Sequence, residues 1–135
     1  MEITGLNHIT FAVSDMDRSV EFYAKVLKAR LLCRSEGVAY FELAGIWLAL
    51  NLGESNPSRG YTHIAFSISE EHFSDWQQHL LGQGVELRSD RNRHADEGKS
   101  LYFQDPDGHL LELHTKSRHD RVKHYRKTRG DMDFF

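Results

Sequence analysis

Hydrophobic and polar positions repeat along this chain with an offset of 55 residues. Residues 5–15 read GLNHITFAVSD, and residues 60–70 read GYTHIAFSISE. Aligned without a gap, the two segments place His8 opposite His63, and each alternates apolar and polar positions as a strand does. A repeat with only two copies excludes a solenoid, which needs at least about three.

Each predicted strand runs into a segment with helical periodicity. In the first copy, apolar residues recur at helical spacing over residues 16–27, and residues 14–17 (SDMD) predict a capping box before them. In the second copy, Ser69 is the expected N-cap of a helix whose apolar stripe covers residues 73–81. Gly82 then predicts the end of that helix.

Three short strands are expected after each helix, which gives paired βαβββ modules of α+β class. The strands are predicted at residues 31–35, 38–43 and 46–51, and again at 85–89, 100–104 and 109–114. Within the last hairpin, the sequence DPDG at residues 105–108 predicts a type I turn. The expected organisation is one domain, 1–135, with module one at about 1–52, a linker at 53–59, module two at about 60–116 and a basic C-terminal helix or tail at 117–135.

Composition limits the possible partners. The 135 residues carry a net charge of only −3, with acidic and basic residues interspersed, so we expect no nucleic-acid partner. No apolar stretch approaches the roughly 20 residues that cross a bilayer, so no membrane partner is expected either. A single cysteine, Cys33, excludes an intrachain disulfide, and the N-terminal residues do not read as a signal peptide. The expected compartment is the cytoplasm.

The two equivalent histidines are the first candidate ligands of a metal. His8 and His63 each lie on the first strand of their copy, and pairing of the two sheets would direct both imidazoles into one cleft. Either histidine alone is more typical of an ordinary strand position, but a converging pair is what a transition-metal site needs.

A carboxylate on the last strand would complete such a site. Glu112 lies between Leu111 and Leu113, and a charge there is costly to bury unless it is paired or bound to metal. The alternative is a glutamate that faces water. His114 shares its face and is a rival ligand, but it lies about 6–7 Å further along the strand. One ion would therefore not take both.

The repeat also predicts open coordination positions. Aligning the two last hairpins places Ala49 opposite Glu112, so the second acid of a symmetric site is missing. Two histidines, one carboxylate and an open shell are typical of a catalytic rather than a structural ion. Ligands of mixed N and O type without thiolate suit Mn²⁺, Fe²⁺, Ni²⁺ or Zn²⁺.

Aromatic and basic residues are expected around the ion. By strand alternation, Trp47 shares the face of Ala49, and Tyr61 shares the face of His63, while Tyr40 and Tyr102 occupy equivalent hairpin positions. Arginines that could bind a phosphate-like or carboxylate group lie in the polar loop at residues 88–99 and near the cleft rim, at Arg88, Arg91, Arg93 and Arg121.

Five motifs in combination resemble the metal-dependent, fosfomycin-inactivating thiol transferases of the vicinal oxygen chelate superfamily. They are NHITFAV, AYFELAGIWLALN, YTHIAFS, SLYFQDPDGHLLELH and the final DMDFF, and the resemblance extends over nearly the whole chain. The resemblance implies that His8, His63 and Glu112 bind a divalent metal, Mn²⁺ or Mg²⁺ first and Ni²⁺ or Zn²⁺ as alternatives. It also implies a homodimer of interlocked chains, in which each site takes ligands from both.

The resemblance further implies how substrates bind and react. The thiol co-substrate is the nucleophile that opens the epoxide of fosfomycin, and Thr10 or a tyrosine such as Tyr40 assists by hydrogen bonding to the epoxide oxygen. The residues matching the substrate site are Thr10, Tyr40, Trp47, Tyr61, Ser100, Tyr102 and Arg121, together with Arg91 and Arg93 of the loop.

The branch of this family, and hence the thiol, stays open between bacillithiol, L-cysteine and glutathione. Thr10 matches the glutathione-using branch, whereas the length and arginine spacing of the loop around Arg91 and Arg93 match the bacillithiol-using branch. The potassium-binding loop of the glutathione-using branch is not clearly reproduced. A third branch hydrolyses the epoxide with a glutamate base, and the matching position is Val38.

Two rival functions share the architecture. An Fe(II) ring-cleaving dioxygenase also uses two histidines and one carboxylate, whereas a lactoylglutathione lyase would need a fourth ligand at the position of Ala49. A metal-free, drug-sequestering protein on the same scaffold would need no His-His-Glu set.

Overall fold

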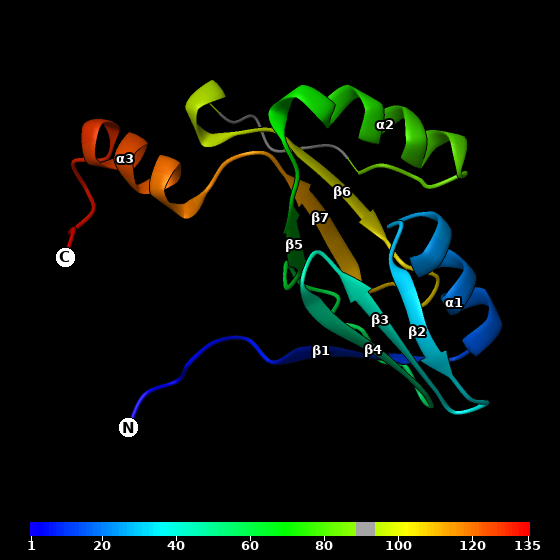
Figure 1. Ribbon diagram of the computed structural model, residues 1–135. Helices are drawn as coiled ribbons and strands as arrows, with labels where there is room; N and C mark the ends of the chain where they lie inside the picture. Colours follow the sequence, from blue (N-terminus) through cyan, green and yellow to red (C-terminus); the bar gives the residue numbers. More distant parts are fainter. Residues whose placement is uncertain (89–93) are drawn as a thin grey trace. The chain divides into compact units, whose positions relative to one another are not determined.

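The computed structural model describes residues 1–88 and 94–135, and these residues form two compact units (Figure 1). Unit 1 comprises residues 1–62 and 104–109, and unit 2 comprises residues 63–103 and 110–135. The short turn at residues 104–109 thus groups with the first half of the chain, although the second half surrounds it in sequence.

Unit 1 is a four-stranded sheet with a helix on one face. The strands are β1 (His8–Val13), β2 (Arg30–Arg34), β3 (Val38–Leu43) and β4 (Ile46–Leu52), in the order β1-β4-β3-β2, and the helix is α1 (Met16–Lys25). β1 runs parallel to β4, whereas β4 with β3 and β3 with β2 are antiparallel. Alternation buries Phe11, Leu48 and Leu50 on one face, where α1 packs, and leaves His8 and Thr10 for the other.

The start of α1 differs from the sequence prediction. Its N-cap is Asp15, whose carboxylate accepts the backbone N–H of Arg18, so the predicted cap at Ser14 is wrong. Ser14 is engaged elsewhere, since its hydroxyl and its backbone N–H both donate to Oδ1 of Asp107. Asp15 therefore caps the helix, while Ser14 binds the turn at residues 105–108.

The predicted turn at residues 105–108 is confirmed. The N–H of Gly108 donates to the carbonyl of Asp105 at 3.0 Å, and Gly108 has a φ of 98°, which favours glycine. The buried carboxylate of Asp105 accepts the N–H groups of Asp107 and His109 at 3.0 and 2.8 Å, and the hydroxyl of Tyr23 at 2.8 Å. One acid thus holds the turn and fastens it to α1.

The buried hydroxyl of Tyr23 predicts a loss of stability in alkali. Burial, and next the charge of Asp105, raise the pKa of Tyr23 well above its usual 10.0. The folded chain therefore holds this proton more tightly than the unfolded chain. Its contribution to stability is complete below pH 10 and declines above it by about 1.4 kcal/mol per pH unit, until the folded pKa is reached.

Replacing Tyr23 with Phe should therefore remove part of the alkaline decline. At pH 7 we expect Tyr23→Phe to cost about 1–2 kcal/mol, because the acceptor on Asp105 loses its donor. Urea unfolding from pH 7 to 11 should show that this deficit shrinks above pH 10, with the half-exposed Tyr61→Phe as the control. A deficit that stays constant across that range would contradict the raised pKa.

Unit 2 is a three-stranded sheet over its described residues. The strands are β5 (Ile64–Ser67), β6 (Ser100–Gln104) and β7 (Leu110–His114), in the order β5-β7-β6, and β5 runs parallel to β7. The strand predicted at residues 85–89 is wrong over residues 85–88. Only Arg88 pairs there, in an isolated bridge to Tyr102, and residue 89 lies outside the described residues.

The helices of unit 2 follow the predicted order. A short 3-10 turn, η1 (Glu70–His72), begins after Ser69 and leads into α2 (Phe73–Gly82), whose N-cap is His72 rather than Ser69. The side chain of Ser69 makes no capping hydrogen bond, so the predicted N-cap is displaced by that turn. α2 ends at Gly82 as predicted.

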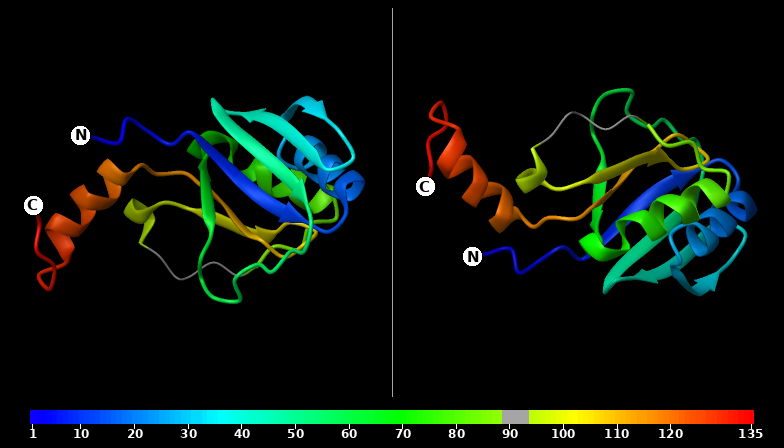
Figure 2. Two further views of the ribbon diagram at one scale, coloured as in Figure 1. Left: turned by 90° about the horizontal axis from the view of Figure 1, so that it is seen from below. Right: turned by 90° about the horizontal axis from the view of Figure 1, so that it is seen from above.

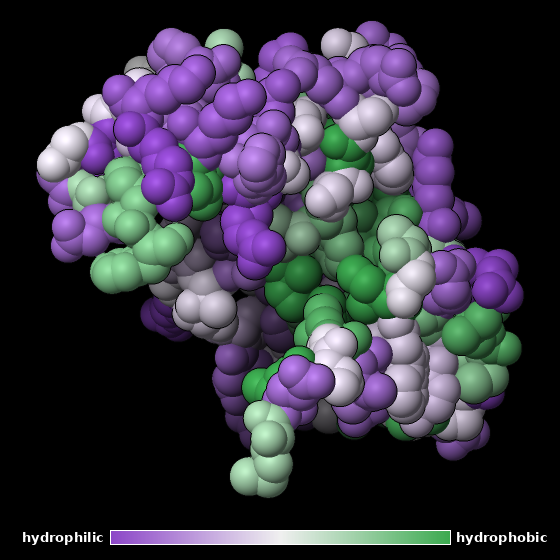
Figure 3. Space-filling view, turned by 60° about the vertical axis from the view of Figure 1, so that its left-hand side comes forward, coloured by the Kyte–Doolittle hydropathy of each residue, from purple (hydrophilic) through white to green (hydrophobic). Residues whose placement is uncertain are grey.

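The C-terminal segment forms a helix beside a second 3-10 turn. α3 (Arg118–Thr128) starts with a reciprocal capping box between Ser117 and Asp120, and it lies next to η2 (Ala95–Glu97) in both views of Figure 2. In the space-filling view, hydrophilic residues cover most of the upper part of the face (Figure 3). Among the described residues, the helices are too short or too polar to span a membrane.

Candidate active site

In unit 2, a histidine and a buried glutamate face each other. Ala65 of β5 pairs with Glu112 of β7, so His63, two residues before Ala65, projects on the same side as the carboxylate. Nε2 of His63 lies 2.8 Å from Oε2 of Glu112. Glu112 is only 4% exposed, and its neighbours Leu111 and Leu113 are buried on the opposite face. The glutamate therefore does not face water.

A chain of hydrogen bonds orients this carboxylate through Oε1, the oxygen that does not meet His63. The hydroxyl of Ser100 donates to Oε1 of Glu112 at 2.5 Å and contacts Nδ1 of His114 at 2.9 Å. Nε2 of His114 lies 3.3 Å from Nη2 of Arg121, and a guanidinium can only donate. His114 therefore carries its proton on Nδ1 and donates it to Ser100. The four groups form one directed chain that ends on Glu112.

These hydrogen bonds place His114 behind Glu112 and not beside it as a rival ligand. Its Nδ1 lies 3.3 Å from Oε1 of Glu112, on the side away from the oxygen that meets His63. A histidine placed in this way would fix the direction of the lone pairs of the carboxylate. The outer oxygen, Oε2, remains directed at His63.

The His63–Glu112 pair fits a divalent cation. Adjacent ligand atoms at about 2.1 Å from an ion in octahedral geometry lie about 3.0 Å apart. The 2.8 Å separation of Nε2 and Oε2 is close to that spacing. A buried carboxylate with an imidazole is also the donor set that Mn²⁺ and Zn²⁺ accept.

Unit 1 carries the other predicted ligand in an aromatic setting. The strand registers pair His8 with Trp47, and Thr10 and Tyr40 with Ala49, so these side chains share one face of the sheet. The rings of His8 and Trp47 lie 4.8 Å apart, and those of Tyr40 and Trp47 lie 5.2 Å apart. Trp47 therefore borders His8, as alternation predicts.

The imidazole of His8 is oriented by its neighbour. Nδ1 of His8 lies 2.7 Å from Oδ1 of Asn7, an acceptor, so Nδ1 carries the proton and Nε2 keeps its lone pair. This is the arrangement of a histidine prepared to bind a metal through Nε2. His8 belongs to unit 1, whereas the His63–Glu112 pair belongs to unit 2.

Two further tyrosines of the predicted substrate site lie in different units. Tyr102 is buried, with its ring 5.6 Å from that of His63, and Tyr61 is half exposed in unit 1. Arg91 and Arg93 lie outside the described residues.

Two residues that the sequence analysis missed hold Arg121. Arg121 donates to the carbonyl of Glu97 at 2.8 Å, and Tyr125 donates to the carboxylate of Glu97 at 2.7 Å. That hydrogen bond from Tyr125 is the main reason why the pKa of Glu97 is lowered. In the sequence, the only sign that Arg121 and Tyr125 share a partner is their i,i+4 spacing, which places them on one face of a helix.

Comparison with known proteins identifies the family. A family model described as the Glyoxalase/Bleomycin resistance protein/Dioxygenase superfamily matches residues 5–113. The chain is 46% identical over 137 residues to the metallothiol transferase FosB of Staphylococcus haemolyticus strain JCSC1435, covering 98% of this chain and 99% of that protein. The chain belongs to the metallothiol transferase family. A second metallothiol transferase FosB, from Shouchella clausii, is also 46% identical and covers 96% of this chain and 92% of the relative.

Solved structures resemble this metallothiol transferase throughout. The fosfomycin resistance protein FosX of Listeria monocytogenes, complexed with Mn(II) and sulfate, has a TM-score of 0.86 at 36% identity, covering 92% of this chain and 99% of that one. A variant of the same FosX, complexed with Mn(II) and 1S,2S-dihydroxypropylphosphonic acid, has a TM-score of 0.85. The predicted α+β glyoxalase fold and the prediction of a thiol transferase are both confirmed, whereas the interlocking of two chains stays a prediction.

Proposed function

We propose that this metallothiol transferase opens the epoxide ring of fosfomycin by adding a low-molecular-weight thiol. The observation that carries the proposal is the His63–Glu112 pair, because a buried carboxylate beside an imidazole suits a metal-assisted reaction. The names of the relatives, metallothiol transferase and fosfomycin resistance protein, supply the substrate class.

The proposed ion is Mn²⁺ or Mg²⁺, held by His8, His63 and Glu112. Mn²⁺ is favoured because the similar FosX was crystallised with it, while Ni²⁺ and Zn²⁺ are alternatives for the same donors. When bound, such an ion acts as a Lewis acid toward the phosphonate and epoxide oxygens.

The chain's own residues bind and orient the substrate. Arg121 presents guanidinium donors suited to a phosphonate, and its Nε is a buried donor that finds no hydrogen-bond partner within the described parts of the chain. Tyr40, Trp47 and Tyr102 wall the site, and Thr10 or Tyr40 donates to the epoxide oxygen. Tyr61, Ser100, Arg91 and Arg93 complete the proposed substrate set.

The reaction itself needs no protein nucleophile. The deprotonated sulfur of the thiol attacks a ring carbon in line, a C–S bond forms, and the C–O bond on the far side breaks. The ring oxygen then takes up a proton and becomes a hydroxyl. Cys33, a free and exposed cysteine of β2, has no part in this step.

The assembly and the compartment are part of the same proposal. We expect a cytoplasmic homodimer, in which His8 of one chain joins His63 and Glu112 of another. Potassium dependence is a question for the turnover assay, since the motif for it is not clearly reproduced.

Hydrolysis is the second candidate function. The diol bound to FosX is what addition of water to the fosfomycin epoxide would give, and FosX is a near structural match. The resemblance to the family places the glutamate base of the hydrolysing branch at position 38. Val38, the first residue of β3, carries no group that could deprotonate water. We therefore favour thiol addition.

A turnover assay tests the proposal. Fosfomycin and Mn²⁺ should give product, followed by ³¹P NMR, with at least one of bacillithiol, L-cysteine and glutathione, and no product without thiol. Parallel tubes with and without K⁺ test the need for a monovalent cation. Product in the thiol-free tube would identify a hydrolase, and no product in any tube would reject fosfomycin as the substrate.

A further inference from the structure

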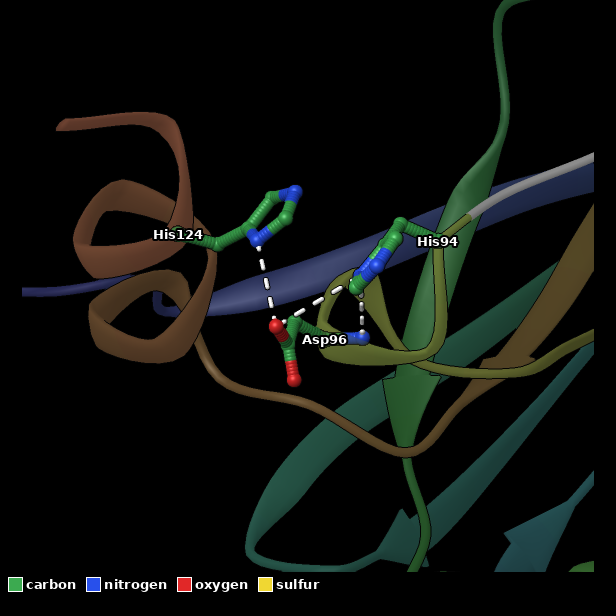
Figure 4. Close-up of side chains that lie close together, drawn as sticks. All are labelled: His94, Asp96 and His124. Atoms are coloured by element: carbon green, nitrogen blue, oxygen red, sulfur yellow. Dashed lines mark hydrogen bonds and ion pairs between the residues drawn. The ribbon is translucent and has the colours of Figure 1, made fainter. Parts of the chain in front are cut away.

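A second cluster of metal-binding side chains lies where η2 meets α3. It comprises His94, Asp96 and His124, each of which offers one ligand atom, and these atoms lie within 4.8 Å of one another. In Figure 4 the two imidazoles approach the carboxylate of Asp96 from either side. The cluster shares no residue with the His63–Glu112 pair.

The distances in this cluster match a small tetrahedral ion. Nδ1 of His94 and Nδ1 of His124 each lie 3.4 Å from Oδ2 of Asp96. Ligand atoms at about 2.0–2.1 Å from a tetrahedral Zn²⁺ ion lie about 3.3–3.4 Å from each other. Both separations therefore agree with the edges of such a tetrahedron, and the third pair of ligand atoms, from His94 and His124, lies within 4.8 Å.

The surroundings hold the two imidazoles in place. The rings of His94 and His124 stack with their centroids 4.9 Å apart and an interplanar angle of 16°. The side chain of His124 is only 9% exposed, although Asp96 is 68% exposed. The His94 side chain is 64% exposed, so His94 and Asp96 leave the cluster open to solvent, and only His124 is largely buried.

The remaining contacts of the cluster are weak enough to be replaced. Nδ1 of His94 accepts the N–H of Asp96 at 3.3 Å, near the upper limit for a hydrogen bond. The carboxylate of Glu97 accepts the N–H of His94 at 3.1 Å and adds negative charge nearby. Lys116 opposes a cation, because its charge interacts with Asp96, but its ammonium is paired with Glu70 at 3.0 Å.

We propose that His94, Asp96 and His124 form a second divalent-cation site that takes Zn²⁺ or a similar borderline metal. Two imidazoles and one carboxylate leave a fourth position for water, which is the coordination number that Zn²⁺ prefers. The donor types are those of the first proposed site, so the preference for Zn²⁺ rests on spacing: 3.4 Å between ligand atoms here suits a tetrahedral ion, whereas 2.8 Å between His63 and Glu112 is close to octahedral spacing.

Occupation of this site would fasten η2 to α3. Arg121 lies one helical turn before His124, and it already contacts η2 through the carbonyl of Glu97. A bound ion would therefore restrain the helix that carries Arg121. An effect of the ion on substrate binding by Arg121 rests on the proposed function, whereas binding of the ion itself does not.

Zinc binding to matched variants tests the site. Competition with a chromophoric chelator should show one zinc more per chain in the wild type than in His124→Gln. The control is His119→Gln, which removes an exposed histidine from the same helix and should leave the count unchanged. We expect the remaining affinity at the cluster to fall by more than about tenfold, since even changes outside the ligand shell cost that much.

The outcomes separate binding from folding. Equal zinc counts in the wild type and His124→Gln would overturn the proposal, as would equal losses in His124→Gln and His119→Gln. If His124→Gln does not fold, Asp96→Asn replaces it, and an unchanged zinc count in that variant overturns the proposal as well. Zinc-induced ¹⁵N shifts at the imidazoles of His94 and His124 report on the site without any turnover.

Discussion

Glu112→Gln is expected to lower metal-dependent turnover about 1000-fold. The amide keeps the size of the side chain but removes the only charge of the His63–Glu112 pair when His63 is neutral. A metal that loses its anionic ligand loses several kcal/mol of binding and of transition-state stabilisation, and about 4 kcal/mol corresponds to a factor of 1000.

The same substitution should leave the fold intact. Glu112 is 4% exposed, and a buried amide is less costly than a buried carboxylate, so the melting temperature without metal should be unchanged or higher. Turnover, the affinity for Mn²⁺ by EPR and the melting temperature are measured together. Glu86→Gln, an exposed position of unit 2, is the control and should behave as the wild type. Near-normal turnover in Glu112→Gln would refute the ligand assignment.

The repeat explains why so much of the fold could be predicted. Alternation in two aligned segments predicts both first strands, and the structure places Phe11 and Phe66 in the core and the histidines on or beside those strands. Strand alternation also places Glu112 and His114 on one face, which their hydrogen bonds to Ser100 confirm. The alternation of side chains along each strand, with a period of two residues, was thus enough to predict which residues share a face.

Where the sequence prediction failed, competing local interactions decided. Ser14 is a good N-cap by type, but Asp107, 93 positions away, takes its hydroxyl, and Asp15 caps the helix instead. Residues 85–88 have the composition of a strand, yet only Arg88 pairs with the sheet. Neither outcome could be read from neighbouring residues, because each depends on a partner distant in sequence.

The support of the site was also invisible in the sequence. Glu97 lies in a polar loop whose residues show no periodicity, and its role follows only from its contacts with Arg121 and Tyr125. Such outer contacts are made by side chains from separate elements, so a single sequence cannot reveal them. They nevertheless govern how the ligands are oriented.

Arg121→Lys is expected to reduce kcat/KM for fosfomycin about 100-fold. Lysine keeps the charge but has no planar fork, so it cannot contact His114, the carbonyl of Glu97 and a phosphonate at once. Losing charge-assisted hydrogen bonds of about 1.5–3 kcal/mol accounts for a loss of this size. Because the phosphonate is bound before and during the reaction, most of the loss should appear as a higher KM.

Arg118→Lys is the matched control, since it makes the same exchange at an exposed position of α3. If Arg121 acts on substrate, KM should rise in Arg121→Lys alone, and the melting temperature should change little. A fall in kcat with an unchanged KM would instead assign Arg121 to the orientation of Glu112 through His114 and Ser100. Equal kinetics in the two variants would remove Arg121 from the site, because the guanidinium fork would then have no use that an ammonium cannot meet.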